Sequence, residues 1–117
     1  MWVFLNDAFL SAVEHRDDSD KLMVRARLQG DLDRVFPDLA GQVKKTPTAD
    51  YRFRLVVSRE RFMQAMMDEV GRIDYTNFKN SVAEYGRHQI YLDVWQVMFE
   101  AQDAEARRLG AQAKGAR

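Results

Sequence analysis

Apolar side chains recur at every second position over residues 21–28, with mostly basic side chains between them. Side chains at every second position of a β-strand point to the same face of the sheet. The pattern therefore predicts a strand with one buried face and one solvent-facing face, which is typical of antiparallel sheets. The inward set is Leu22, Val24, Ala26 and Leu28, and the outward set is Lys21, Met23, Arg25 and Arg27.

Other segments extend the predicted sheet. Two apolar runs, residues 2–5 and 8–15, flank an Asn-Asp pair with turn character and predict a β-hairpin. A further strand is predicted at about residues 50–57, after a loop over residues 38–50 that is rich in polar residues, glycine and proline. In the strand at 50–57 the inward set is Tyr51, Phe53, Leu55 and Val57, and the outward set is Arg52 and Arg54.

Helical periodicity replaces the alternation in two places before residue 74. Asp31 is suited to cap a short helix that Pro37 ends, because proline disfavours the helical conformation in the residue before it. Ser58 is suited to cap a longer helix over residues 59–72. Apolar side chains recur there at spacings of three and four, which predicts one buried stripe. Its methionines are expected to fill a core or, alternatively, to line a pliable binding groove. The stripe consists of Phe62, Met63, Met66, Met67, Val70 and Ile73.

The last third of the chain predicts two more helices. A short one is capped by Asp74 or Thr76, and a long one begins at Arg87. Trp95 lies on the apolar stripe of the long helix and is expected, like Trp2, to belong to a core. Trp2 is close to the start of the sequence and could instead be a surface anchor at an interface.

The predicted element order is therefore β-β-β-α-β-α-α-α. Strands with tight connections come first and the largest helices come last, so we expect an α+β fold. Its sheet is expected to be four-stranded and mostly antiparallel, with helices packed on one face. We predict one compact domain over residues 1–102 and a helical extension that frays into a flexible tail over residues 103–117.

Composition narrows the function classes. The chain has 117 residues, no cysteine, and 18 acidic against 18 basic side chains. The lack of cysteine excludes disulfide scaffolds, thiol nucleophiles and thiolate metal sites. No run approaches the ~20 apolar residues of a membrane helix, and the first residues lack the basic region of a secretory signal peptide. We therefore expect a cytoplasmic protein that uses no metal ion or other cofactor.

Charge is distributed unevenly along the chain, because residues 21–61 are predominantly basic. If the two strands with basic outward side chains share a sheet, its open face suits phosphate groups, since guanidinium offers a planar fork of donors. A solvated face neutralised by nearby carboxylates explains the same residues. The inward placement of Tyr51 and Phe53 counts against a base-stacking platform. The candidate partner- or anion-binding residues are Lys21, Arg25, Arg27, Arg52 and Arg54.

A second cluster of polar and aromatic side chains falls within residues 74–88. It gathers carboxylate, phenol, amide, ammonium and imidazole groups, from which an acid–base site could be assembled. Helix caps, packing anchors and solvated charges explain the same residue types. The residues of this possible second site are Asp74, Tyr75, Asn77, Lys79, Arg87 and His88.

Two segments carry a resemblance to other proteins, the opening residues 1–4 (MWVF) and residues 73–79 (IDYTNFK). The chain resembles a group of short bacterial proteins that share an N-terminal M-W-x-F and a central I-D-Y-x-N-F-K segment. The likeness covers roughly residues 1–99. The group has no assigned activity, so the resemblance implies a compact domain and no particular chemistry.

Three functions from different classes fit these patterns. Small size, segregated charge and a methionine-rich helix favour a non-enzymatic module that binds a protein or nucleoprotein partner. One form is a phage or mobile-element inhibitor of a host defence complex. The alternatives are a nucleic-acid-binding protein that uses the arginine-rich sheet face, and a small enzyme that uses the region from Asp74 to His88. The lack of phosphate-loop, dinucleotide and nucleophile-elbow motifs favours the first function over the enzyme.

Overall fold

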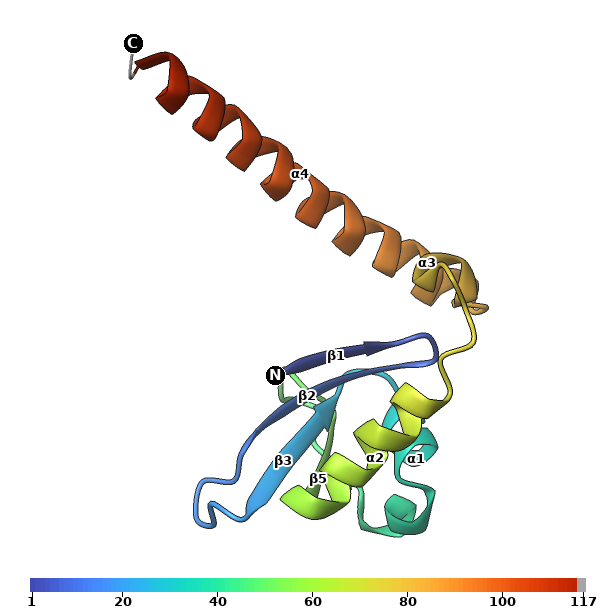
Figure 1. The fold of residues 1–117 in the computed structure, drawn as a ribbon. Helices are drawn as coiled ribbons and strands as arrows, with labels where there is room; N and C mark the ends of the chain where they lie inside the picture. Colours follow the sequence, from blue (N-terminus) through green and yellow to red (C-terminus); the bar gives the residue numbers. More distant parts are fainter. Residues whose placement is uncertain (116–117) are drawn as a thin grey trace. The chain divides into compact units, whose positions relative to one another are not determined.

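The computed structural model describes residues 1–115 (Figure 1). Backbone contacts divide the chain into two compact units, Met1–Thr76 and a second unit that begins at Asn77. The first unit is α+β and the second is helical. The domain boundary expected near residue 102 stays a prediction.

The first unit contains an open antiparallel sheet with the strand order β1-β2-β3-β5-β4. The expected α+β class with an antiparallel sheet is confirmed, but the sheet has five strands instead of four. The additional strand, β4, has two residues and lies within the predicted loop, where so short a segment gives no alternation to detect. A 3₁₀ helix, η1 (Pro37–Gln42), precedes it. The strands are β1 (Trp2–Leu5), β2 (Ala8–Glu14), β3 (Lys21–Ala26), β4 (Lys44–Lys45) and β5 (Phe53–Ser58).

The predicted hairpin is confirmed, and Leu5 pairs with Ala8 across its two-residue turn. The alternation in β3 also holds, with Val24 and Ala26 fully buried. β3 ends at Ala26, however, so Leu28 lies beyond the strand and is 46% exposed. The inward position predicted for Leu28 is therefore wrong.

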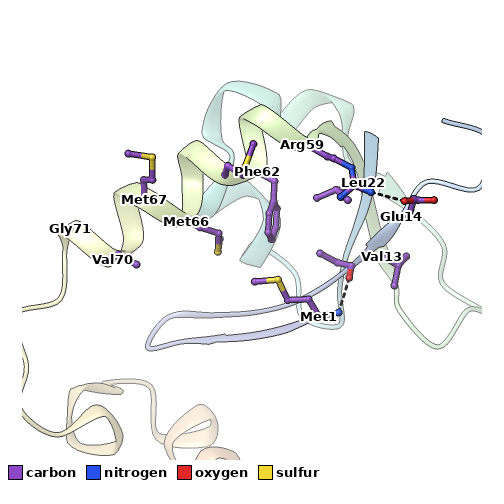
Figure 2. A pocket seen from close by; sticks show the side chains of 12 residues that line it. Met1, Val13, Glu14, Leu22, Arg59, Phe62, Met66, Met67, Val70 and Gly71 are labelled. Atoms are coloured by element: carbon purple, nitrogen blue, oxygen red, sulfur yellow. Dashed lines mark hydrogen bonds and ion pairs between the residues drawn. The ribbon is translucent and has the colours of Figure 1, made fainter. Parts of the chain in front are cut away.

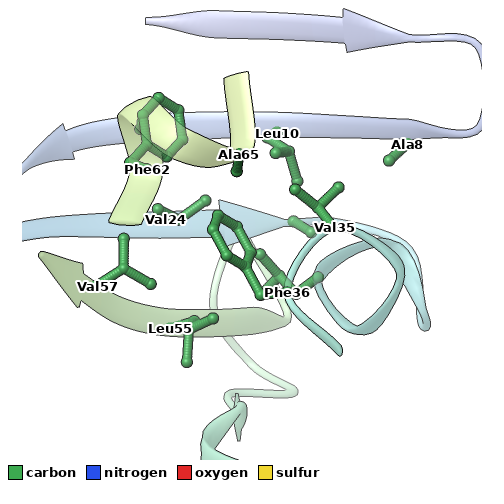
Figure 3. Close-up of a cluster of buried hydrophobic side chains, with 12 residues drawn as sticks. Ala8, Leu10, Val24, Val35, Phe36, Leu55, Val57, Phe62 and Ala65 are labelled. Atoms are coloured by element: carbon green, nitrogen blue, oxygen red, sulfur yellow. The ribbon is translucent and has the colours of Figure 1, made fainter. Parts of the chain in front are cut away.

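The core lies between one face of the sheet and two helices, α1 (Asp31–Val35) and α2 (Arg59–Gly71) (Figure 3). It combines inward side chains of β2, β3 and β5 with apolar side chains of both helices. Phe36, just after α1, stacks on Phe62 of α2 with ring centroids 6.4 Å apart. The buried cluster is Ala8, Leu10, Ala12, Val24, Ala26, Leu32, Val35, Phe36, Leu55, Val57, Phe62 and Ala65.

Asp31 does not cap α1 as predicted. Gly30 occupies the N-cap position with a φ of 93°, a left-handed conformation that glycine adopts without steric cost. Asp31 is the first helical residue and is buried, and its carboxylate accepts a hydrogen bond from the Phe9 N–H at 3.0 Å. The side chain therefore ties the start of α1 to β2.

Ser58 caps α2 as predicted, and its Oγ accepts the Arg61 N–H at 3.0 Å. The predicted buried stripe of this helix is only partly buried. Phe62 and Ala65 face the sheet, because α2 meets the sheet along a single line of contact. The side chains displaced from that line are exposed, at 57% for Met63, 68% for Met67 and 66% for Val70. Ile73 lies beyond the end of α2 and is 54% exposed.

The second unit consists of α3 (Phe78–Ser81) and α4 (Tyr85–Gly115). Asn77 caps α3, since its Oδ1 accepts the Asn80 N–H at 3.2 Å, so the caps predicted at positions 74 and 76 are wrong. α4 begins at Tyr85, two residues before the predicted start. The Phe78 ring stacks on Tyr91 with ring centroids 5.7 Å apart, and this contact joins the two helices.

Neither tryptophan is buried as predicted, because Trp2 is 66% exposed and Trp95 is 46% exposed. Among the described residues of the second unit, the four-residue α3 is the one other helix, and Trp95 stacks on Phe99 of its own helix. α4 is helical through Gly115, and the fraying expected within residues 103–117 stays a prediction, since residues 116 and 117 lie outside the described residues. No helix among the described residues has both the length and the apolar character needed to cross a membrane.

Candidate functional site

Two of the five predicted anion-binding residues lie at the centre of the outer sheet face, the face opposite the core. Arg25 on β3 and Arg54 on β5 are direct cross-strand partners. Lys21 stands at the start of β3, where its Nζ lies 3.9 Å from the Asp18 carboxylate. The structure therefore brings Arg25 and Arg54 together and leaves Lys21 at the strand end.

Tyr51 holds two arginines in place beside this pair. Its side chain is buried, and the guanidinium carbons of Arg25 and Arg27 lie 4.4 and 4.1 Å from the ring centroid. Both are cation–π distances. Tyr51 is buried as predicted, but it precedes β5, lies outside the main core cluster and contacts Arg25 through its ring. Arg27 also donates to the Asp50 carbonyl at 2.8 Å, and Arg52 is exposed in the same bend.

One row of residues, each paired with the next across neighbouring strands, spans the whole sheet on its outer face. We call it the cross-strand row. Sequence reasoning found its two arginines and left Trp2 between a core and a surface anchor. It missed Lys44, which was assigned to a loop. The alternation within residues 2–5, combined with the tight turn that sets the hairpin register, could have predicted that Trp2 lies on the outer face. The cross-strand row consists of Trp2, Ser11, Arg25, Arg54 and Lys44.

The possible second site is divided between the two units. Asp74 and Tyr75 belong to the end of the first unit, whereas the other four predicted residues belong to the second. In the second unit, Lys79 Nζ lies 3.5 Å from Asn77 Oδ1, which is also the cap of α3.

The remaining members of that set have structural partners in the second unit. Lys79 Nζ lies 5.3 Å from the centroid of the Trp95 ring. Arg87 is buried, with its Nε 3.5 Å from the Glu84 carboxylate, and the His88 N–H donates to the Glu84 carbonyl within the first turn of α4. Among the described residues, no group of three or more histidine, aspartate or glutamate side chains is arranged to hold a metal ion.

An open apolar groove of about 980 Å³ runs along α2 on the first unit (Figure 2). α2 contributes one wall, and β2, β3 and the N-terminal residue contribute the other. The charged side chains in the lining are Glu14 and Arg59, which form an ion pair at 2.7 Å. The apolar side chains that line the groove are Met1, Ala12, Val13, Leu22, Phe62, Met63, Met66, Met67 and Val70.

The methionines of α2 were predicted to fill a core, with a pliable binding groove as the alternative, and the exposed Met63 and Met67 line such a groove. Large apolar side chains that gather at a protein surface mark an interaction site more often than scattered ones do. Methionine adapts its shape readily, because its side chain is unbranched and polarizable. The groove is thus suited to packing against an apolar surface.

Comparisons with protein-family models, with curated proteins and with solved structures gave no match to this chain. The resemblance to short bacterial proteins therefore stays a prediction.

Proposed function

We propose that this chain is a non-enzymatic binding module whose α2 groove accepts the apolar face of an amphipathic helix from a protein partner. The observation that carries the proposal is the exposure of Met63, Met67 and Val70, each more than half accessible along one wall of the groove. Burying these side chains against a partner removes apolar surface from water at roughly 25 cal/mol per Å².

The dimensions of the groove fit a helix. α2 has 13 residues, which corresponds to about 20 Å of helix length. A partner helix of about three turns would place apolar side chains at i, i+3 or i+4, and i+7 along that length. Val13 and Leu22 line the sheet side of the groove opposite α2.

Charge restricts which partner fits. The side chains of the lining are apolar apart from Glu14 and Arg59, which already pair with each other, and the Met1 ammonium donates to the Ala12 carbonyl. A partner that buries a lone charge in the groove would lose hydration without gaining a counter-ion. The favoured ligand is therefore a helix with an uncharged apolar stripe. A module that holds such a helix can act as an adaptor or as an inhibitor of a larger host complex.

Site-specific photo-crosslinking tests the proposal. A benzophenone amino acid replaces Met67 in the groove, and in a matched control it replaces Gln64, an exposed residue of the same helix that does not line the groove. We expect the benzophenone at position 67 to form an adduct with a partner protein. The crosslinked peptide of that partner should carry apolar residues at helical spacing. Nuclease treatment should leave the adduct intact, and Met63→Glu should abolish it.

Equal adduct yields at positions 67 and 64 would contradict the proposal. So would an adduct that maps to an extended or charged segment of the partner.

A further inference from the structure

We propose that the outer sheet face is a second binding surface, which takes single-stranded nucleic acid along the cross-strand row. Phosphate groups lie at the basic end of the row and a base stacks on Trp2 at the other end. This goes beyond the helix-binding function, because the row shares no residue with the lining of the α2 groove.

The register places three cations next to one another. Arg25 pairs with Arg54, and Arg54 pairs with Lys44. Neighbouring strands lie about 4.8 Å apart, so these three backbone positions span about 10 Å. Trp2 lies two strands away from Arg25 on the other side, at a similar separation.

The arginine pair has too little negative charge around it. Like charges directly opposite each other destabilise a sheet. Among the described residues, the one carboxylate in an ion pair with these two arginines is Asp50, at 3.3 Å from Arg54. Arg25 donates to the neutral Ser11 Oγ at 2.8 Å. A phosphate would relieve the repulsion and accept several guanidinium hydrogen bonds at once.

The guanidinium of Arg25 is also preorganised. Tyr51 lies under it at a centroid distance of 4.4 Å, and Ser11 accepts one of its hydrogen bonds. Holding a flexible side chain in place before binding lowers the entropy lost when a ligand arrives. Packing and hydrogen bonding therefore fix this cation on the open face before any ligand binds.

A hollow of about 600 Å³ lies beside the basic end of the row. Lys44 and Arg54 line one part of it, and His15, Met23 and Gln42 line another. Polar and apolar side chains thus meet next to the cations, which suits a sugar and base attached to the bound phosphates.

The aromatic end of the row favours nucleic acid over an acidic protein. The Trp2 indole is 66% exposed, and the Phe9 ring supports it edge-on at 5.9 Å. Unpaired bases stack on such rings in single-stranded nucleic acid platforms, whereas a duplex keeps its bases stacked internally. An acidic peptide would use the cations alone.

Fluorescence anisotropy with labelled dT₁₂ and rU₁₂ tests the proposal on the full chain. About three phosphate contacts predict a slope near −2 when log K is plotted against log salt, at about 0.7 per contact on a single strand. Arg54→Ala should weaken binding at least tenfold and reduce the slope by about 0.7. Trp2→Ala should weaken binding about 5- to 150-fold and leave the slope unchanged.

The matched control is Arg107→Ala, which removes the same charge from an exposed residue of α4. It should leave the affinity unchanged. Stacking has its own readout, because Trp2 is the remaining tryptophan in a Trp95→Phe background. Its fluorescence should be quenched when either oligonucleotide binds. Thermal melting of each variant, followed by circular dichroism, separates lost binding from lost folding.

Two results would overturn the proposal. One is the absence of any anisotropy change with either oligonucleotide at low salt, at protein concentrations up to 100-fold above that of the labelled strand. The other is binding that Arg107→Ala weakens as much as Arg54→Ala does. If poly-glutamate competes as well as dT₁₂ and Trp2→Ala has no effect, the surface is specific for acidic protein and the nucleic-acid proposal is wrong.

Discussion

α1 and α2 lie over the same face of the sheet, but they bury very different shares of their apolar side chains. Leu32 and Val35 of α1, and Phe36 just after it, are all less than a tenth exposed. In α2, Met63 and Met67 are more than half exposed. Both segments show helical spacing in the sequence, so the spacing alone does not tell them apart.

The comparison shows what the apolar spacing of a helix measures. It indicates a face that prefers an apolar environment, and the tertiary fold decides how much of that face the same chain covers. α1 is short enough for its whole face to lie on the sheet. The apolar face of α2 is wider than the part of the helix that contacts the sheet. The apolar side chains outside that contact form one wall of the groove.

Truncation of Phe36 should have the largest effect on stability. Phe36 is fully buried and packs against Phe62, so Phe36→Ala leaves a cavity and should destabilise the first unit by about 3–5 kcal/mol. Urea unfolding followed by far-UV circular dichroism measures the change. A loss below about 1 kcal/mol would mean that α1 does not complete the core.

A smaller effect is expected at the start of α2. Ser58 satisfies the Arg61 N–H, and Ser58→Ala leaves that donor without its side-chain partner. We expect a loss of about 1 kcal/mol in the free energy of unfolding. Ser58→Asp, which keeps an acceptor at the cap, should lose much less. Equal losses in the two variants would show that the cap does not hold α2 in place.

The pair Arg61–Asp38 gives a pH test of the contact between α2 and η1. A hydrogen bond at 2.7 Å from Arg61 lowers the pKa of the Asp38 carboxyl below its ordinary value of 3.8. Because the pKa of Asp38 is lowered in the folded state, the pair stabilises the protein at pH values above the ordinary pKa. This contribution is lost as the pH falls through the lowered pKa. As the pH is lowered below 4, the unfolding free energy of Asp38→Asn should therefore decrease less steeply than that of the wild type. Parallel curves would contradict the expectation.

The smallest effect on stability is expected in the groove. Met67→Gln removes little buried surface, so its unfolding free energy should stay within about 0.5 kcal/mol of the wild type. The same variant should reduce the yield of the photo-crosslinked partner when the benzophenone replaces Met63. A loss of stability above about 1.5 kcal/mol would mean that Met67 packs in a core and that the groove is closed in solution.

Much of the sheet could be predicted because strand alternation has a short, regular period. The hairpin, β3, β5 and the cap at Ser58 followed from residues that are close in sequence. β4 was missed, since its two residues are held only by pairing with a strand eight residues away. The local sequence pattern of so short a segment does not predict such pairing.

The candidate sites were predicted in part for the same reason. Alternation placed Arg25 and Arg54 outward, and the register then made them neighbours. The sequence did not show that Trp2 and Lys44 complete the same row, because that depends on the order of the strands. Whether a methionine on α2 is buried or exposed depends on the width of contact with the sheet, which no spacing of residues encodes.

β4 has a consequence for how molecules of this protein behave at high concentration. It forms one edge of the sheet, and it consists of Lys44 and Lys45 alone. A second sheet edge would have to approach two ammonium groups and would find only two residues to pair with. This edge therefore resists growth into a continuous sheet between molecules. Replacing both lysines with valine would remove that protection, and aggregation would be expected to rise while the fold stays the same.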